Sequence, residues 1–189
     1  SGDSTRVFGL PYTPVKRPDF EELKGKAGGG TCPFCPESID ASTPRFPSGI
    51  IPEGRLRVGE ACVMPNLLPM DRYTGVCVIS HDHFIPIGEF TAAVLRDAFR
   101  ASVLFVKKVA EADPGAHYYN INWNYMPPAG SSMAHPHLQI NCGAVPTQRL
   151  RTQMESSLRY FMKNGTTFWN DYMAAEREAG ERYLADIGP

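Results

Sequence analysis

Alternating and clustered apolar residues predict four strands in this chain. Residues 55–64 alternate between apolar and polar positions and include β-branched side chains, as a half-buried strand does. Residues 73–80 form a continuous apolar run, which is typical of a strand buried on both faces. Residues 118–125 alternate again, and residues 135–142 follow a turn rich in proline and glycine. The pattern therefore predicts a small sheet.

Helical spacing of apolar residues predicts three helices. Thr91 can cap a helix over residues 91–112, whose apolar stripe comprises Val94, Leu95, Ala98, Phe99, Val103, Val106, Val109 and Ala110. Two further helices are predicted over 148–163, after a cap at Thr147, and over 168–184. The predicted fold class is α+β: a mostly antiparallel sheet, one long helix between strands, and helices at the carboxyl end.

Length and composition are those of a globular protein with one main domain. The 189 residues are 42% apolar and 21% charged. We expect a loop-rich amino-terminal arm over 1–30, a domain over 31–146 and carboxy-terminal helices over 147–189. The net charge of −1 shows none of the basic excess of nucleic-acid binders.

Cysteine usage and the lack of targeting signals predict a cytoplasmic protein without a membrane span. Five cysteines are an odd number, and two form a CxxC pair, which favours reduced thiols and a metal over disulfides. The amino terminus shows no secretory signal, and no apolar run reaches membrane-spanning length. The other three cysteines, Cys62, Cys77 and Cys142, lie in apolar strand segments and are expected in the core.

The segment His135-Pro136-His137-Leu138-Gln139 carries the main chemical signal. In a strand, its two histidines and its glutamine share one face, and the two residues between them share the other. The preceding turn, residues 130–132, can offer backbone N–H groups and hydroxyls to an anion. A neutral imidazole beside an anion can attack phosphorus if an acceptor fixes its tautomer. The structural alternative is that both histidines serve metal binding or packing.

Gln139 narrows the range of reactions that the motif predicts. A carboxamide cannot act as a general acid, but it can hydrogen-bond a phosphate oxygen. A leaving phosphate departs without needing a proton, whereas an alkoxide needs one. Gln139 therefore favours exchange of one phosphate for another over expulsion of an alcohol.

The pair Cys32 and Cys35 has the spacing of a zinc knuckle. Structural zinc needs four ligands, and the residues alone leave the other two open among His81, His83, His117, His135 and the remaining cysteines. The alternative is a buried pair of thiols without a metal.

These motifs together resemble one branch of the histidine-triad superfamily, the galactose-1-phosphate uridylyltransferases. In that family an asparagine and a Gly/Ser turn precede H-P-H-G-Q, and the spacing from Asn124 to Gln139 agrees without a gap. The CxxC pair matches the family's zinc knuckle, and residues 80–83 match its Ser-Pro-Asp-His element. The similarity extends over nearly the whole chain, including residues 3–18 and the helix that leads into the family's second repeat.

The resemblance implies a role for each matching residue. His137 would be the nucleophile that carries the nucleotide, with Gln139 beside it. The implied zinc ligands are Cys32, Cys35, His83 and His135. The implied substrate-binding residues are Asn124, Ser131, Ser132 and Arg17.

The resemblance further implies a nucleotidyltransferase. It would move a nucleoside monophosphate, UMP in this family, from a nucleotide sugar to a hexose 1-phosphate. Leu138 replaces the family's glycine and makes the motif closer to that of diadenosine tetraphosphate phosphorylases, so a phosphorylase is the alternative. Met126 replaces another family glycine, two residues after the asparagine.

The family carries two repeats, and this chain corresponds to the first. We expect either a fragment of a longer protein or a one-repeat member that forms a homodimer. The missing repeat supports a second alternative, a non-catalytic, zinc-stabilised module that binds a nucleotide without turnover.

Overall fold

The structure is a computed structural model that describes residues 6–7, 10–11, 32–126, 129–131 and 133–185. The chain divides into two compact units, residues 1–144 and residues 145–189. The predicted arm over residues 1–30 lies almost entirely outside the described residues. Of that arm the structure gives two short paired strands, β1 (Arg6–Val7) and β2 (Leu10–Pro11).

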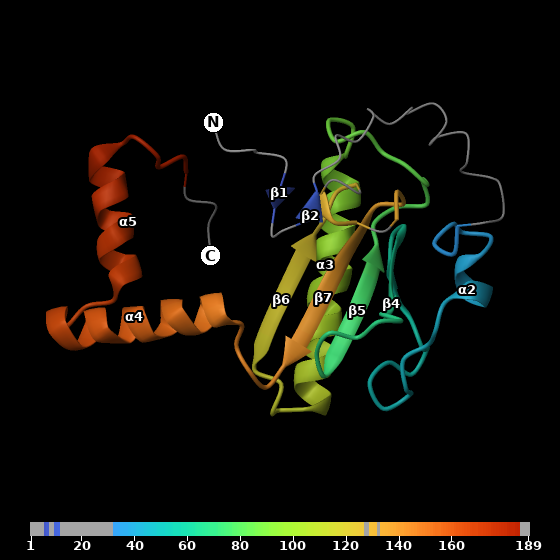
Figure 1. Cartoon of the computed structure of the whole chain (residues 1–189), viewed down its shortest axis with the longest axis horizontal. Coiled ribbons are helices and arrows are strands. Elements are labelled where there is room, and N and C mark those ends of the chain that lie inside the picture. Colours follow the sequence, from blue (N-terminus) through green and yellow to red (C-terminus); the bar gives the residue numbers. More distant parts are fainter. Residues whose placement is uncertain (1–5, 8–9, 12–31, 127–128, 132, 186–189) are drawn as a thin grey trace. The chain divides into compact units, whose positions relative to one another are not determined.

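The first unit is built on a five-stranded antiparallel sheet with the order β3-β4-β5-β7-β6 (Figure 1). The strands are β3 (Leu56–Val58), β4 (Ala61–Pro65), β5 (Tyr73–Val78), β6 (Tyr118–Trp123) and β7 (His137–Gly143). The α+β prediction with an antiparallel sheet is confirmed. β7 lies between β5 and β6 and pairs with both.

The single strand predicted over residues 55–64 is wrong, because this segment is a hairpin. Val58 pairs with Ala61, so only two residues form the turn between β3 and β4. Gly59 has φ +56°, a left-handed conformation that glycine adopts without steric cost. A Cβ at Gly59 would also lie 2.3 Å from Asp97 Oδ2 on the neighbouring helix. The alternating pattern therefore came from two short strands.

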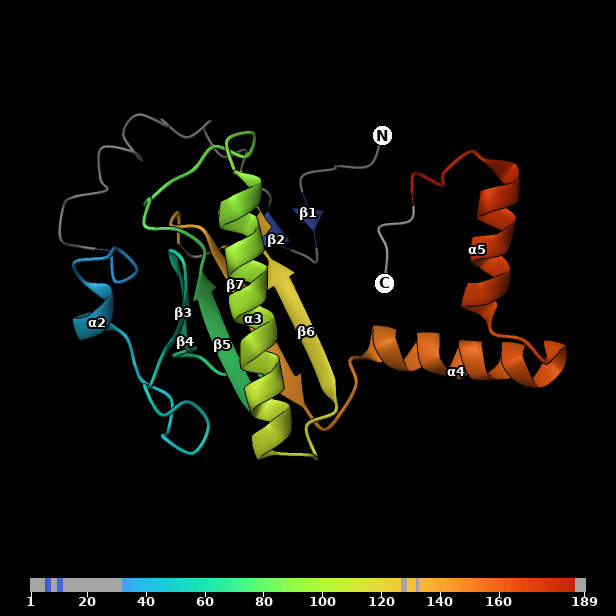
Figure 2. The same cartoon turned by 180° about the vertical axis from the view of Figure 1, so that it is seen from behind.

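One long helix covers one face of the sheet (Figure 2). The helix α3 (Ala92–Ala112) begins at Thr91, whose hydroxyl accepts a hydrogen bond from Val94 N–H at 3.3 Å, as predicted. Phe105 and other small or apolar residues of α3 pack on the inward residues of the strands. Leu138, Ile140 and Cys142 of β7 belong to this main core, as does Cys77. The predicted core positions of the cysteines are confirmed, with Cys62 buried in a second cluster on the opposite face.

The second cluster lies on the sheet face opposite α3, over β4 and β5. It consists of Ile39, Cys62, Met64, Val76 and Val78, with Phe34 packed against them. The covering segment includes the short helix α2 (Ile39–Ser42), which the sequence pattern did not predict.

Arg55 fixes the segment that contains α2. Its guanidinium is buried and donates hydrogen bonds to the carbonyls of Ile39, Asp40 and Thr43 at 2.6–3.3 Å. Arg55 directly precedes β3, so these bonds connect the segment to the sheet. The motif Cys32–Cys35 lies just before the same segment.

The second unit contains two helices, α4 (Gln148–Asn164) and α5 (Phe168–Ala179). Thr147 caps α4 as predicted, and its hydroxyl accepts from Leu150 N–H at 3.3 Å. The predicted end of the last helix at residue 184 is wrong. Gly180 has φ +67° and ends α5, because its N–H bonds back to the Glu176 carbonyl in a left-handed cap.

Among the described residues, no helix has the length and apolar character needed to cross a membrane.

Candidate metal centre and nucleophile

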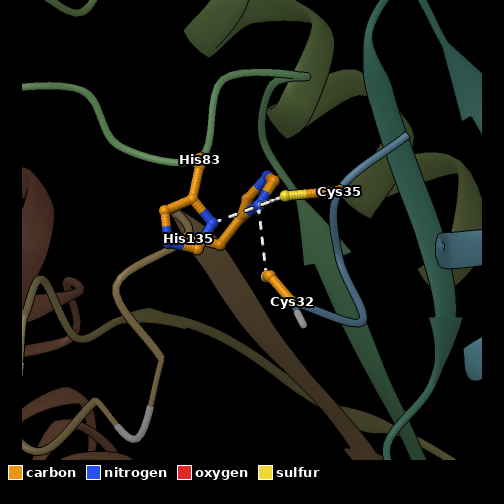
Figure 3. A group of neighbouring side chains, drawn as sticks. All are labelled: Cys32, Cys35, His83 and His135. Carbon is orange, nitrogen blue, oxygen red and sulfur yellow. Dashed lines mark hydrogen bonds between the residues drawn. The ribbon is translucent and has the colours of Figure 1, made fainter. Parts of the chain in front are cut away.

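Two loops and a turn bring four potential metal ligands together (Figure 3). Cys32 and Cys35 lie in a tight turn in which Cys35 N–H donates to the Cys32 carbonyl at 3.3 Å. His83 lies in the loop after β5, and His135 lies two residues before the first residue of β7. Their ligand atoms all lie within 4.8 Å of one another, and all four residues are buried.

The separations between these atoms fit a tetrahedral ion. Cys35 Sγ lies 3.4 Å from His83 Nδ1 and 3.7 Å from His135 Nδ1, and Cys32 Sγ lies 3.7 Å from His135 Nδ1. Metal–sulfur and metal–nitrogen bonds typical of zinc would place S and N about 3.6 Å apart at a tetrahedral angle. The four residues therefore form a cluster that can hold a metal ion.

The cluster also decides between the histidines that the sequence left open. His81 and His117 are exposed, whereas His83 is buried against Cys35. The two thiols are not an isolated pair, because two histidine nitrogens lie within 3.4–3.7 Å of them. Burial and the neighbouring Cys32 raise the pKa of Cys35 to about 12, so a bound cation is what would stabilise its thiolate.

His135 has a fixed tautomer. Its Nε2 lies 2.9 Å from the Ser80 carbonyl oxygen, which can only accept, so Nε2 carries the proton. Nδ1 then presents its lone pair to the two thiols. Burial lowers the pKa of His135 to about 4, which keeps the ring neutral as a ligand must be.

Glu60 supports this arrangement from the hairpin turn between β3 and β4. Its Oε2 accepts hydrogen bonds from the Ser80 hydroxyl at 2.6 Å and from His81 N–H at 3.0 Å. These two bonds lower the pKa of Glu60. Glu60 thereby holds the loop that carries His83 and the carbonyl partner of His135. This role was not predicted, because it depends on the hairpin between β3 and β4.

His137 is the first residue of β7, and its ring also has a fixed tautomer. Its Nδ1 donates to the carbonyl oxygen of His135 at 2.9 Å, because a carbonyl can only accept. The lone pair is therefore on Nε2. Burial lowers the pKa of His137, so the ring is neutral near pH 7. The metal ligand and the candidate nucleophile are thus joined through one backbone carbonyl.

The other candidate residues on β7 separate by face. Gln139 shares the face of His137 and lies opposite Asn122 of β6. Leu138 is 1% exposed and packs in the core on the α3 side. Leu138 therefore cannot contact a substrate at His137, although the motif differs from the family pattern there.

The turn before β7 is held partly by its own hydrogen bonds. The Ser131 hydroxyl donates to the Met133 carbonyl at 2.7 Å and accepts from Met133 N–H at 3.3 Å. The amide nitrogen of Asn124 lies against this turn, 3.6 Å from where a Cβ on Gly130 would be. Of the predicted substrate-binding residues, Arg17 and Ser132 lie outside the described residues.

Met126 occupies a strained position in the same loop. Its φ is +68°, a left-handed conformation that is uncommon outside glycine. Its side chain is nevertheless buried, which offsets part of the cost. Glycine would adopt the same backbone conformation without this cost.

An apolar cavity of about 220 Å³ lies over β4 and β5, and Phe34 connects its wall to His137. Phe34, Met64, Val76 and Met133 are among its lining residues. The Phe34 ring meets the His137 ring edge-on, with centroids 5.4 Å apart. The sequence did not identify this cavity, since its walls come from five separate segments.

Comparisons with known proteins agree with this fold. An ADP-glucose phosphorylase from Arabidopsis thaliana, solved with bound ADP-glucose, superposes with a TM-score of 0.60 at 19% identity, over 72% of this chain and 47% of that chain. A uridylyltransferase superposes with a TM-score of 0.57 at 19% identity, over 82% of this chain and 49% of that chain. An uncharacterized protein of Archaeoglobus fulgidus is 36% identical over 172 residues, which are 90% of this chain and 50% of that protein.

No family model matches the sequence. The chain spans about half the length of each of these three proteins. The resemblance to the uridylyltransferases is confirmed at the level of the fold.

Proposed function

We propose that this domain, which has the fold of the uridylyltransferases, transfers a nucleoside monophosphate between phosphate groups through a covalent nucleotidyl-His137 intermediate. The hydrogen bond from His137 Nδ1 to the His135 carbonyl carries this proposal. It leaves a neutral Nε2 lone pair at the start of β7, next to Phe34 of the cavity wall.

The reaction has two balanced steps. His137 Nε2 attacks the α-phosphorus of the donor, a P–N bond forms, and the P–O bond to the leaving phosphate breaks. The leaving group departs as a phosphate anion, so no general acid is required. An oxygen of the second phosphate then attacks the same phosphorus and releases His137. The Nδ1 proton stays on the ring throughout, bonded to the His135 carbonyl.

Gln139 and the cavity would contact different parts of the donor. Gln139 is two residues after His137 and lies on the same face of β7. From there its amide N–H can donate a hydrogen bond to a phosphate oxygen. The apolar cavity lined by Phe34 suits the flat face of a nucleobase. The phosphorus under attack would then lie between the base and the leaving group.

Zinc is the metal that the four-residue cluster fits best. Two thiolates and two imidazoles complete a tetrahedron, which is the closed coordination of structural zinc. When bound, zinc would stabilise the fold and fix the positions of its ligands. Cys32, Cys35 and His83 would hold it, and His135 would connect it to the backbone that orients His137.

The proposed donor is a nucleotide sugar and the proposed acceptor is a hexose 1-phosphate, with UMP as the transferred group. The likeness to uridylyltransferases supports this choice. A phosphorylase that uses inorganic phosphate as the acceptor is the second candidate, supported by the likeness to an ADP-glucose phosphorylase. The buried position of Leu138 removes its side chain as a contact that could decide between them.

The test is the intact mass of the protein after incubation with UDP-glucose or, separately, with ADP-glucose. We expect a uridylyl or adenylyl adduct that maps to His137, and its identity gives the base. His137→Ala should form none, whereas the matched variant of an exposed histidine, His81→Ala, should form as much as wild type. Loss of the adduct on adding glucose 1-phosphate, or on adding inorganic phosphate, then identifies the acceptor.

Failure of the wild-type protein to form an adduct with either donor would contradict the proposed transfer. Nucleotide binding without an adduct would instead favour the non-catalytic binding module. An adduct on another residue would contradict the assignment of His137.

A further inference from the structure

Four carboxamide side chains form a row on the sheet beyond His137. Asn120 and Asn122 come from β6, and Gln139 and Asn141 come from β7. The register pairs Asn122 with Gln139 and Asn120 with Asn141, so the row consists of two adjacent cross-strand pairs. We call these four residues the carboxamide row.

The row lies on the same face as His137. Leu138, Ile140 and Cys142 pack in the core beneath α3, so the residues between them on β7 point to the opposite face. Ile121 and Trp123 of β6 also pack against that core, which leaves Asn120 and Asn122 on the face away from α3. Directly paired residues share a face, so the two strands agree.

The carboxamides have unused hydrogen-bonding capacity. Within the part of the chain that the structure describes, none of the four side chains has a hydrogen-bond partner, and Asn141 Oδ1 is also buried. Buried polar atoms without partners are uncommon and costly in folded proteins. Asn120 and Asn122 are exposed, so a ligand can reach the row.

The chemistry of the row favours a neutral ligand rich in hydroxyl groups. β5, β6 and β7 contain no Asp, Glu, Lys or Arg, so these three described strands provide no fixed cation for a further phosphate. A carboxamide both donates and accepts, which matches the hydroxyls of a sugar. The apolar cavity for a base lies on the same face of the sheet but over β4 and β5, whereas the row lies on β7 and β6.

We propose that Asn120, Asn122 and Asn141 bind the sugar of the donor, with Asn122 beside Gln139 and the other two one step further from His137. The inference rests on the proposed function, which places the reacting phosphorus at His137. Residues two apart on one face of a strand are about 7 Å apart, so Asn141 lies about 13 Å from His137. That span accommodates a second phosphate followed by a hexose ring. The row thus selects a nucleotide sugar over a dinucleoside polyphosphate.

The experiment measures calorimetric affinities of the zinc-loaded protein for UDP, UDP-glucose, ADP, ADP-glucose and diadenosine tetraphosphate. For the nucleotide sugar of the preferred base, Asn122→Ala should weaken binding several-fold, and Asn122→Ala with Asn141→Ala about tenfold or more. Affinity for the matching nucleoside diphosphate and for diadenosine tetraphosphate should change less than about twofold in the same variants.

Gln153→Ala is the matched control, because it removes an exposed carboxamide from α4 in the second unit. It should leave all affinities unchanged. Because Asn122 is exposed, its single variant tests the row even if the double variant folds poorly.

Equal weakening of the sugar and sugar-free ligands, or no weakening of either, would overturn the sugar subsite. Adduct formation from a nucleotide sugar that persists alongside either result would leave the transfer at His137 standing. Failure of the wild-type protein to bind any of the five ligands would overturn the proposed function and this inference together.

Discussion

The two faces of β7 have different roles: one packs in the core and the other carries the candidate site. On the α3 side, Leu138, Ile140 and Cys142 are at most 1% exposed and make only core contacts and backbone pairing. On the other side, His137, Gln139 and Asn141 are polar, and that face also carries the exposed members of the carboxamide row. Successive residues of β7 therefore alternate between packing in the core and facing the candidate site.

The difference shows how the site gains rigidity. Because side chains alternate with a period of two, the apolar residues that lock the register also fix where each polar residue points. A slip of one residue would place His137 in the core and Leu138 in the site. The comparison predicts that variants on the two faces should affect different measurements.

The largest expected effect on chemistry is that of His137→Ala. Adduct formation from a nucleotide sugar should fall at least about 1000-fold, because no other group in the site replaces the nucleophile. The free energy of unfolding should fall by no more than about 2 kcal/mol, since the side chain lies outside the main core. Chemical denaturation and intact-mass analysis check the two expectations. An adduct at wild-type rate would contradict the division between the faces.

Cys32→Ser should affect stability and metal content together. Losing one of four ligands weakens metal binding, and metal-binding energy is folding energy, so we expect a loss of several kcal/mol with substoichiometric zinc. Metal analysis and denaturation of the same sample provide the measurement.

Cys142→Ala is the control, because it removes a buried core thiol without touching the cluster. Its zinc content should equal that of the wild type. A full complement of zinc in Cys32→Ser would refute the metal centre.

Leu138→Ala should reverse the pattern of His137→Ala. Removing a fully buried leucine side chain should lower the free energy of unfolding by about 3 kcal/mol. The rate of adduct formation per folded molecule should stay within a few-fold of wild type, because Leu138 points away from the site. A large loss of rate without loss of stability would show that the two faces are coupled.

Glu60→Gln has the smallest expected effect. The glutamine keeps one acceptor but loses the charge, so near pH 7 the free energy of unfolding should fall by about 0.5–1 kcal/mol, a value limited by the exposure of Glu60. The hydrogen bonds lower the pKa of Glu60 below its ordinary 4.5, so its contribution is present above that pH and lost as the pH falls through the lowered pKa.

The stability difference between wild type and Glu60→Gln should therefore shrink below about pH 4.5, as denaturation at several pH values would show. Metal loss in acid affects both proteins, so only their difference is informative. A difference that grows as the pH falls would contradict this role of Glu60.

Local signals in the sequence predicted much of the fold. The caps at Thr91 and Thr147 act within a few residues, and the structure has them where predicted. The predicted apolar stripe of α3 is only partly right. Ala98 and Val109 are buried, but Phe99 and Val103 are exposed, and the unpredicted Ala101, Ser102 and Phe105 are buried instead. The predicted end of the last helix is wrong, because Gly180 ends α5 in a left-handed cap. The hairpin at Gly59 was missed because two short strands joined by two residues keep nearly the alternation of one strand.

The sequence by itself determined which residue types lie at the site and which of them share a face of β7. Side chains alternate along any strand, so this follows from their spacing alone. Only the tertiary structure decided which histidines meet the thiols. Cys32 and His135 are 103 residues apart in the chain, and their contact depends on where the loops beside β5 and β7 end. The support from Glu60, the cavity beside Phe34 and the pairing of the carboxamide row likewise depend on sheet order and register, which no local spacing encodes.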